Sequence, residues 1–332
     1  MFNIQQPIEI ESCLEQIFQK SLRDQQLEEL INDSIQAFKI FLHNYELAQR
    51  NIKIIVFGSI LNGFETKQSD IDFTITTNSY IPEVKALQYW TQQLEKQTRF
   101  KVEKSILNSR VPVIKLLDQQ NLIYIDLCYN NLLGAINTRL LKAYSQLDEK
   151  VKKGWCFVKN MGKRGKDYIK FSFFIIFNYN TLVTFLTNKL WSAQFIGLGI
   201  QSQQYRFRNE NIITIKTFFV YEGQTYEKLQ LQFQQRISLI SLQSLLQEFF
   251  YYYSQNGQGF NQDYKISINL KEKKDPGVQY SMSDPFDPLH DPLKKINKLF
   301  KNNKAFDNAL LFLKTKQDTE YLFKNENQLS NY

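Results

Sequence analysis

Hydrophobic and polar positions alternate with two different periods along the first 130 residues. Over 9–49 the apolar residues recur near the helical period, which predicts helices. Beyond that point, short runs rich in β-branched and aromatic residues end at polar or glycine positions, as strands do. Strands are predicted over 53–57, 71–76, 100–107, 111–117 and 122–128, with one helix over 83–97. Residues 51–130 are therefore expected to form a small α/β domain.

From Gly134 onward the helical period returns. Helices are predicted over 136–144, 151–164, 171–191 and 237–253, a strand over 264–270, an irregular proline-rich loop over 271–292, and further helices to the end. The two helical parts, 1–50 and 131–332, flank the α/β domain and are expected to pack together as a second domain. The predicted fold class is α+β in two lobes, with the ligand site between the lobes.

The composition of the chain indicates a polyanionic partner. Hydrophobic residues make up 43 % of the 332 residues, enough for a buried core, which excludes wholesale disorder. Lys and Arg exceed Asp and Glu by 41 to 33, giving a net charge of +8. Such a balance favours nucleic acid or nucleotide phosphate as the partner, with an unspecialised basic surface as the alternative.

The small number of cysteines and histidines limits the kinds of site that the chain can form. Three scattered cysteines and two histidines cannot build a disulfide framework or a zinc site. The most apolar run, 171–177, is far shorter than a membrane span, and the N-terminal residues do not resemble a secretory signal. We expect an intracellular protein without membrane contact, with the cytoplasm favoured over the nucleus.

The sharpest local motif is Gly58-Ser59 at the end of a predicted strand, followed after ten residues by Asp70 and Asp72. Glycine allows close approach, and backbone N–H groups at a strand-to-helix turn suit a phosphate, with the Ser59 hydroxyl as a further donor. Asp70 and Asp72 are two residues apart on a strand, so both carboxylates point to one face. Mg²⁺ offsets the repulsion between such carboxylates and binds phosphate oxygens as well.

Asp126 is a third acidic residue, inside the apolar strand pattern 123–128. An aspartate in a buried strand is costly unless it is paired or bound to metal. Together the three carboxylates predict a cage for two Mg²⁺ (or Mn²⁺) ions that activates a 3′-hydroxyl and holds a triphosphate. Each motif alone is common by chance, but the ordered set is rare.

These residues resemble the DNA polymerase β-like nucleotidyltransferase superfamily, and five later segments resemble its non-canonical poly(A) polymerase and terminal uridylyltransferase family. The segments are Asn130-Asn131, 137–148 (which begins Asn137-Thr138-Arg139), 158–163 (Val-Lys-Asn-Met-Gly-Lys), 241–253 (SLQSLLQEFFYYY) and 283–287 (Ser-Asp-Pro-Phe-Asp). They occur in family order and cover roughly 50–300. The resemblance implies a polymerase β-like palm over 51–130 and a helical poly(A) polymerase-associated domain that recognises the nucleotide.

Several nucleotide-binding roles follow from this resemblance. Lys159 and Lys163 are four residues apart and would share a helix face that binds the β- and γ-phosphates, although a solvated basic helix gives the same pattern. Asn137 and Thr138 would contact the nucleotide, although Asn137 could equally cap a helix. Asn160 replaces the aromatic usual after the first lysine. The family's base-stacking tyrosine has no clean match; Tyr179 is the nearest by spacing, with a core aromatic as the alternative.

The nucleotide is indicated by Asp287 and His290 in the proline-rich loop. Uridylyltransferases of the family carry a histidine at this offset, and its ring N–H can donate to uracil O4, where adenine and cytosine present amino donors. The resemblance therefore implies addition of uridine from UTP to RNA 3′ ends. A poly(A)-adding relative that uses ATP and a catalytically decayed scaffold of an RNA-processing complex are the alternatives.

RNA target selection is expected to come from a partner. The lysines at 271–274 and 294–304 offer only sequence-blind contacts to RNA. Family members of this size can work in small-RNA assemblies, for instance beside an RNA-dependent RNA polymerase, and a free-standing tailing enzyme is the alternative. By itself the chain is expected to be monomeric.

Overall fold

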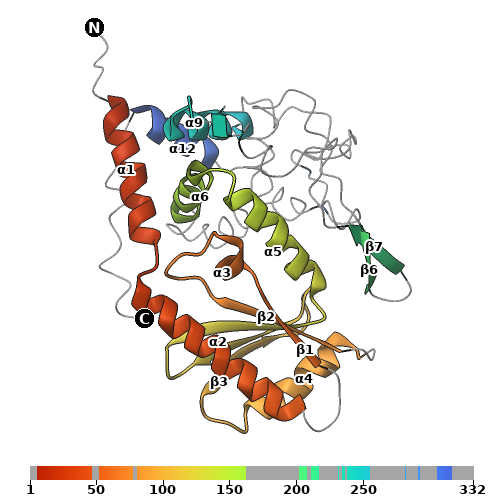
Figure 1. Ribbon diagram of the computed structural model, residues 1–332. Coiled ribbons are helices and arrows are strands. Elements are labelled where there is room, and N and C mark those ends of the chain that lie inside the picture. Colours follow the sequence, from red (N-terminus) through yellow and green to blue (C-terminus); the bar gives the residue numbers. More distant parts are fainter. Residues whose placement is uncertain are drawn as a thin grey trace. The chain divides into compact units, whose positions relative to one another are not determined.

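In the computed structural model the chain divides into two compact units. Their helices and strands are labelled in Figure 1. One unit is 19–146, and the other joins 1–18 to 147–332. The described residues are 6–46, 52–77, 81–161, 202–207, 211–216, 238–254 and 305–315, with isolated positions at 231, 234, 235, 281 and 291.

A five-stranded sheet in the order β1-β2-β5-β4-β3 forms the centre of the unit 19–146. β2 and β5 run parallel at the middle, and the other neighbouring strands pair antiparallel. The strands are β1 (Ile52–Phe57), β2 (Ile71–Thr77), β3 (Phe100–Ile106), β4 (Val113–Asp118) and β5 (Ile123–Tyr129). All five predicted strands are therefore present, within two residues of the expected bounds.

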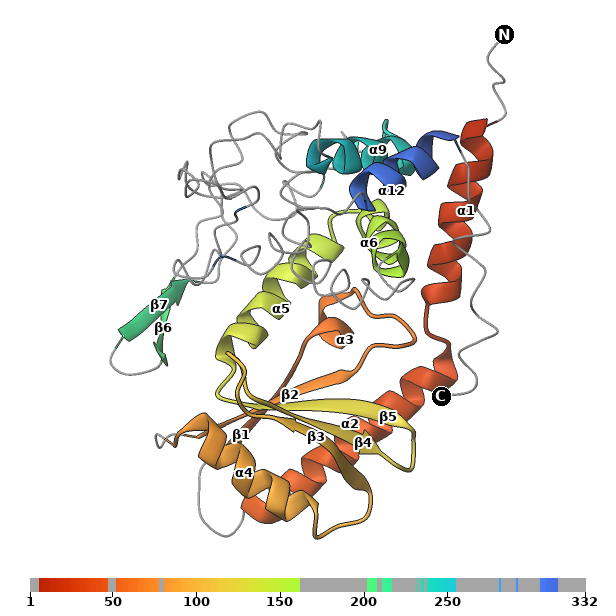
Figure 2. The same cartoon turned by 180° about the vertical axis from the view of Figure 1, so that it is seen from behind.

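Helices α2 (Gln25–Glu46) and α4 (Glu83–Leu94) cover one face of this sheet. Their apolar stripes, including the fully buried Phe38 and Leu87, meet strand residues such as Phe73 and Leu127, also fully buried. Each such side chain contributes about 1.5–3 kcal/mol through burial. Figure 2 shows α2 and α4 on the side of the sheet away from α3 (Ser59–Asn62) and α5 (Leu132–Ser145).

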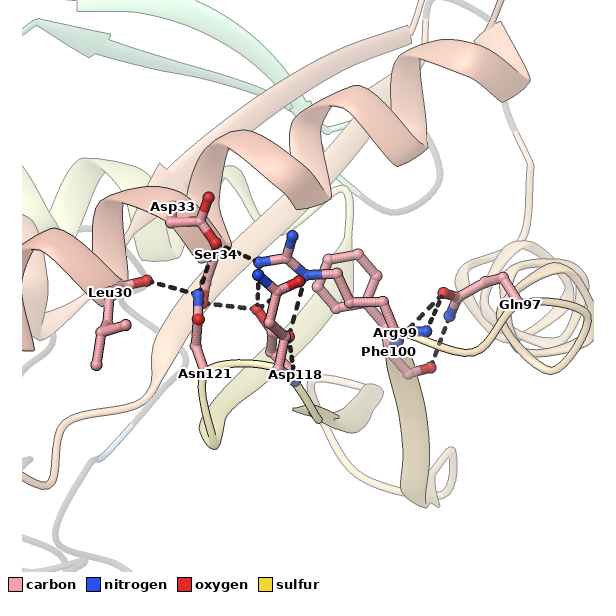
Figure 3. A network of polar contacts seen from close by, with 9 residues as sticks. Leu30, Asp33, Ser34, Gln97, Arg99, Phe100, Asp118 and Asn121 are labelled. Carbon is pink, nitrogen blue, oxygen red and sulfur yellow. Dashed lines mark hydrogen bonds and ion pairs between the residues drawn. The ribbon is translucent and has the colours of Figure 1, made fainter.

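A polar network ties α2 to the ends of β4 and β5 (Figure 3). The fully buried Asp118 accepts hydrogen bonds from Ser34 Oγ at 2.7 Å and from Nε and an Nη atom of Arg99 at 3.0–3.3 Å. Asn121 donates to Ser34 Oγ, to Asp33 and to the backbone of α2. α2 thus belongs to the sheet unit, and that unit is wider at both ends than the 51–130 expected from the sequence.

The other unit contains four described helices and one hairpin. The helices are α1 (Gln6–Ser21, whose last residues enter the sheet unit), α6 (Glu149–Met161), α9 (Leu242–Tyr253) and α12 (Ala305–Thr315); the hairpin joins β6 (Ser202–Phe207) and β7 (Asn211–Lys216). Phe157 of α6 packs edge-on against Phe250 of α9. Gln243 and Gln247 of α9 both donate to the carbonyl of Leu313 in α12.

Two features of this unit differ from the sequence expectation. α9 begins at Leu242 rather than at 237, because the Ser241 hydroxyl accepts from the N–H of Ser244 and caps the helix there. The β6–β7 hairpin is not among the elements predicted from the sequence; its first strand, SQQYRF, is mostly polar and shows little apolar alternation. The helix predicted over 171–191, the strand over 264–270 and the loop over 271–292 lie outside the described residues. No helix among the described residues is long and apolar enough to span a bilayer.

Candidate active site

Two carboxylates stand side by side at the centre of the sheet. Asp72 on β2 is the register partner of Asp126 on β5, and Asp70 directly precedes β2. Their strand neighbours Ile71, Phe73 and Ile125 are fully buried against the helix-covered face. Because side chains alternate along a strand, Asp72 and Asp126 point to the opposite face. The sequence predicts Asp70 and Asp72 on one strand; Asp72 lies on β2, whereas Asp70 directly precedes it.

Lys115 on β4 contacts Asp126 and lies near Asp70, and the sequence analysis did not single it out. It is the register partner of Asp126, and its Nζ lies 2.9 Å from both carboxylate oxygens of Asp126. The same Nζ lies 3.9 Å from Asp70 Oδ2. In the sequence, Lys115 stands out as a charged residue within the apolar run 113–117. Only the register between β4 and β5 shows which acid it contacts.

Asp72 is an acid with a strongly raised pKa. Burial, together with the neighbouring charges of Asp126 and Asp70, raises its pKa to about 8 against the opposing effect of Lys115. Burial beside the same acids also raises the pKa of the Cys128 thiol to about 12. A buried carboxylate next to two others is a site where a cation is favourable.

These acids match Mg²⁺ and Mn²⁺ in donor chemistry, since both ions favour carboxylate oxygens. Within the described residues, no three acidic, histidine or cysteine side chains converge closely enough to hold an ion as they stand. Lys115 Nζ instead holds Asp126 and lies near Asp70. Asp70, Asp72 and Asp126 have the donor chemistry for a divalent ion, and to hold one they would have to draw closer together with Lys115 displaced.

Gly58 forms the turn between β1 and α3 and lies against Asp72. Its φ of 83° and ψ of −159° belong to a region that only glycine adopts readily. A Cβ at this position would lie 1.8 Å from Asp72 Oδ2. The N–H of Gly58 donates to Thr138 Oγ1 at 2.8 Å. That N–H is thus used inside the protein rather than offered to a phosphate as expected, and the half-buried Ser59 is left as the candidate phosphate donor.

Asn137 and Thr138 lie on α5. The N-cap of this helix is Asn131, whose side-chain oxygen accepts a hydrogen bond from the N–H of Gly134. Thr138 is buried, and its hydroxyl accepts from Gly58 and donates to the carbonyl of Gly134 at 2.8 Å. Its side chain is therefore committed to holding the Gly58 turn. Asn137 is half-buried and does not cap the helix, since Asn131 does.

The remaining nucleotide-binding predictions belong to the other unit. Lys159 is half-buried in the last turn of α6. Lys163, Tyr179, Asp287 and His290 lie outside the described residues. Their roles remain predictions from the family resemblance.

Comparison with known proteins agrees with the resemblance. Residues 10–146 match the family model for the central palm domain of mitochondrial-like poly(A) RNA polymerases. Human terminal uridylyltransferase 7 is 33 % identical over 105 residues, which are 30 % of this chain and 7 % of that protein. Poly(A) RNA polymerase cid11 of Schizosaccharomyces pombe is 31 % identical over 121 residues, which are 36 % of this chain and 24 % of that protein. The matches thus span well under two thirds of either relative.

A solved structure of the Cid1 poly(U) polymerase matches 96 % of this chain and 98 % of its own, with a TM-score of 0.64 and 18 % sequence identity. This likeness confirms the expected fold class, a mixed α/β nucleotidyltransferase fold with additional helices. Residues 10–146 thus match a poly(A) RNA polymerase palm domain, and the relatives of the chain are poly(A) polymerases and terminal uridylyltransferases.

Proposed function

We propose that the chain is a template-independent RNA 3′-terminal nucleotidyltransferase that adds uridine from UTP, with Mg²⁺ or Mn²⁺ held by Asp70, Asp72 and Asp126. The adjacent Asp72 and Asp126 on parallel strands, with the Gly58 turn against Asp72, carry this proposal. When bound, divalent ions supply a lower pKa for the attacking 3′-hydroxyl and neutralise charge on the triphosphate.

Different residues of the chain would position the metal ions and the triphosphate. Asp72 and Asp126 are fixed by the sheet register, so their separation does not depend on a loop. The Gly58 turn, held by Thr138, leaves no side chain between the turn and Asp72. Ser59 would donate to a phosphate oxygen, and Lys159 with Lys163 would contact the triphosphate, as the family resemblance implies.

The choice of UTP rests on His290 and Asp287 and on relatives named terminal uridylyltransferases. ATP is the second candidate, because the matching family model and the relative cid11 are poly(A) polymerases. A hydrogen bond from an imidazole to uracil O4 would favour UTP by about 5- to 150-fold.

Incubating labelled single-stranded RNA with Mg²⁺ and each nucleoside triphosphate separately tests the proposal. Faster extension with UTP supports it. Faster extension with ATP contradicts the base preference and favours the poly(A) alternative, and no extension with any triphosphate contradicts the activity. If the chain is a decayed scaffold, a variant with Asp70→Ala and Asp72→Ala keeps the full biological output. Loss of output in that variant excludes the scaffold alternative. Glu95→Gln, at an exposed position, is the control.

For target selection we propose a partner protein in a small-RNA assembly, such as an RNA-dependent RNA polymerase. Support comes from the net charge of +8 and the lysine-rich segments, which give sequence-blind RNA contacts only. Affinity purification at low salt tests this. Recovery of the chain alone, together with sequence-selective RNA binding by it, contradicts the partner.

A further inference from the structure

The face of the sheet away from α2 and α4 carries one continuous row of side chains that crosses all five strands. α3 and α5 lie over this face at β1 and β2, and the face is open towards β4 and β3. Strand pairing aligns Phe57, Asp72, Asp126, Lys115 and Lys104 in that order from β1 to β3. Paired residues in a sheet share a face, so the row is acidic over β2 and β5 and basic over β4 and β3. The negative half is the proposed metal site, and the positive half continues directly from it.

A second row, two residues away along β5, carries an exposed aromatic ring. Tyr124 pairs with Leu117 of β4, and Leu117 pairs with Lys101 of β3. Tyr124 is 53 % exposed, although both of its neighbours on β5 are buried. Tyr124 and Asp126 are two positions apart on the strand, which corresponds to about 7 Å. An aromatic face thus stands one step from the candidate catalytic acids.

The charges beside this ring are mostly basic. Lys104 is exposed, and Lys101, with 58 % of its side chain exposed, pairs with Glu103 at 2.8 Å. Lys104 lies directly opposite Lys115, whose Nζ is bound to Asp126, and Lys104 is the more exposed cation of the two. Lysines interleaved with an exposed aromatic are the pattern that binds the backbone and bases of a single strand.

We propose that the open face of β5, β4 and β3 binds the last nucleotides of the RNA substrate, with a base stacked on Tyr124 and a phosphate on Lys104. This inference rests on the proposed function, because the RNA 3′-hydroxyl must reach the acids at Asp72 and Asp126. It places the RNA on the basic side of the row and leaves the acidic side, with the Gly58 turn, for the nucleoside triphosphate.

The test measures the affinity of the full chain for a 5′-fluorescein-labelled single-stranded RNA. Binding is monitored by fluorescence anisotropy in the absence of any nucleoside triphosphate. Tyr124→Ala is expected to weaken binding about 5- to 150-fold, the value of one stacked base. Tyr124→Phe keeps the ring and should bind like the wild type. Lys104→Gln is expected to reduce the slope of log K against log salt by about 0.7.

Helix α4, on the opposite side of the sheet, offers matched controls. Tyr89 is 51 % exposed there, and Lys85, four residues earlier, is exposed as well. Tyr89→Ala and Lys85→Gln should leave RNA binding unchanged. RNAs with one abasic nucleotide at each of the last three positions locate the stacked base: at that position the abasic RNA should bind wild type and Tyr124→Ala equally.

The outcomes separate this inference from the proposed function. If RNA is extended but Tyr124→Ala binds RNA as tightly as Tyr89→Ala, the RNA path is wrong while the activity stands. If no triphosphate supports extension but Tyr124→Ala still weakens binding selectively, the surface is an RNA-binding face and the activity is wrong. Absence of measurable RNA binding by the wild type also overturns the inference.

Discussion

The backbone N–H of Gly58 donates a 2.8 Å hydrogen bond to the hydroxyl of Thr138, 80 residues later in the sequence. The same hydroxyl donates to the carbonyl of Gly134, so it links the turn after β1 to the first turns of α5. Gly58 in turn lies against Asp72. Thr138 therefore acts as a positioning residue for the candidate site.

Replacing Thr138 by Val removes the acceptor and leaves the part-buried N–H of Gly58 unpaired. We expect the free energy of unfolding to fall by about 1–3 kcal/mol in urea titrations. Thr138→Ser keeps the hydroxyl and should recover most of that loss. A Val variant as stable as the wild type would show that the hydrogen bond contributes nothing.

Gly58→Ala is expected to abolish RNA extension and to destabilise the chain. The new Cβ would overlap Asp72 Oδ2 and would occupy a backbone region that side chains avoid. Gly63→Ala is the matched control, because Gly63 has a similar φ of 80° but ends α3 in the ordinary left-handed region; it should cost only about 1–2 kcal/mol. Equal behaviour of the two variants in thermal melts and extension assays would contradict the close approach of Gly58 to Asp72.

The Arg99–Asp118 pair should be a main anchor of α2 on the sheet. Arg99→Met leaves the buried carboxylate of Asp118 without its cation, and we expect a loss of about 3–5 kcal/mol in unfolding free energy. Lys101→Met, which breaks the exposed pair with Glu103, should change stability by no more than about 1 kcal/mol. Chemical denaturation of both variants measures this difference; a small effect of Arg99→Met would show that packing alone holds α2.

The metal-free protein should lose stability as the pH rises towards 8. The pKa of Asp72 is about 8 in the folded chain, because of burial and of the charges of Asp126 and Asp70, against about 3.9 when unfolded. The folded state therefore holds a proton that the unfolded state releases, and this contribution is full below about pH 4 and is lost as the pH approaches 8.

Melting temperatures between pH 6 and 9 with a chelator measure this dependence. The stability of the wild type relative to Asp72→Asn should fall across this range, since asparagine does not titrate. Adding Mg²⁺ should raise the melting temperature of the wild type more at pH 8 than at pH 6. A wild type and variant that follow the same pH curve would contradict the raised pKa.

Sequence periodicity predicted the sheet and the position of Asp72 and Asp126, because two-residue alternation within a strand decides which side chains share a face. It could not predict Lys115 as the partner of Asp126, since that contact depends on the register between β4 and β5. The role of Thr138 was also missed, because its hydrogen bond joins two segments far apart in the chain. The network around Asp118 likewise required α2 to be placed on the sheet.

Metal-dependent extension of labelled RNA by the wild type and by Asp126→Asn tests the central claim most directly. Asparagine keeps the size of the side chain but removes one of the three carboxylate charges and weakens the contact with Lys115. We expect the rate of nucleotide addition in Mg²⁺ to fall by about 100-fold or more, with the fold intact by circular dichroism and with Glu95→Gln unchanged. Extension by Asp126→Asn at the wild-type rate would contradict a metal site built on Asp70, Asp72 and Asp126.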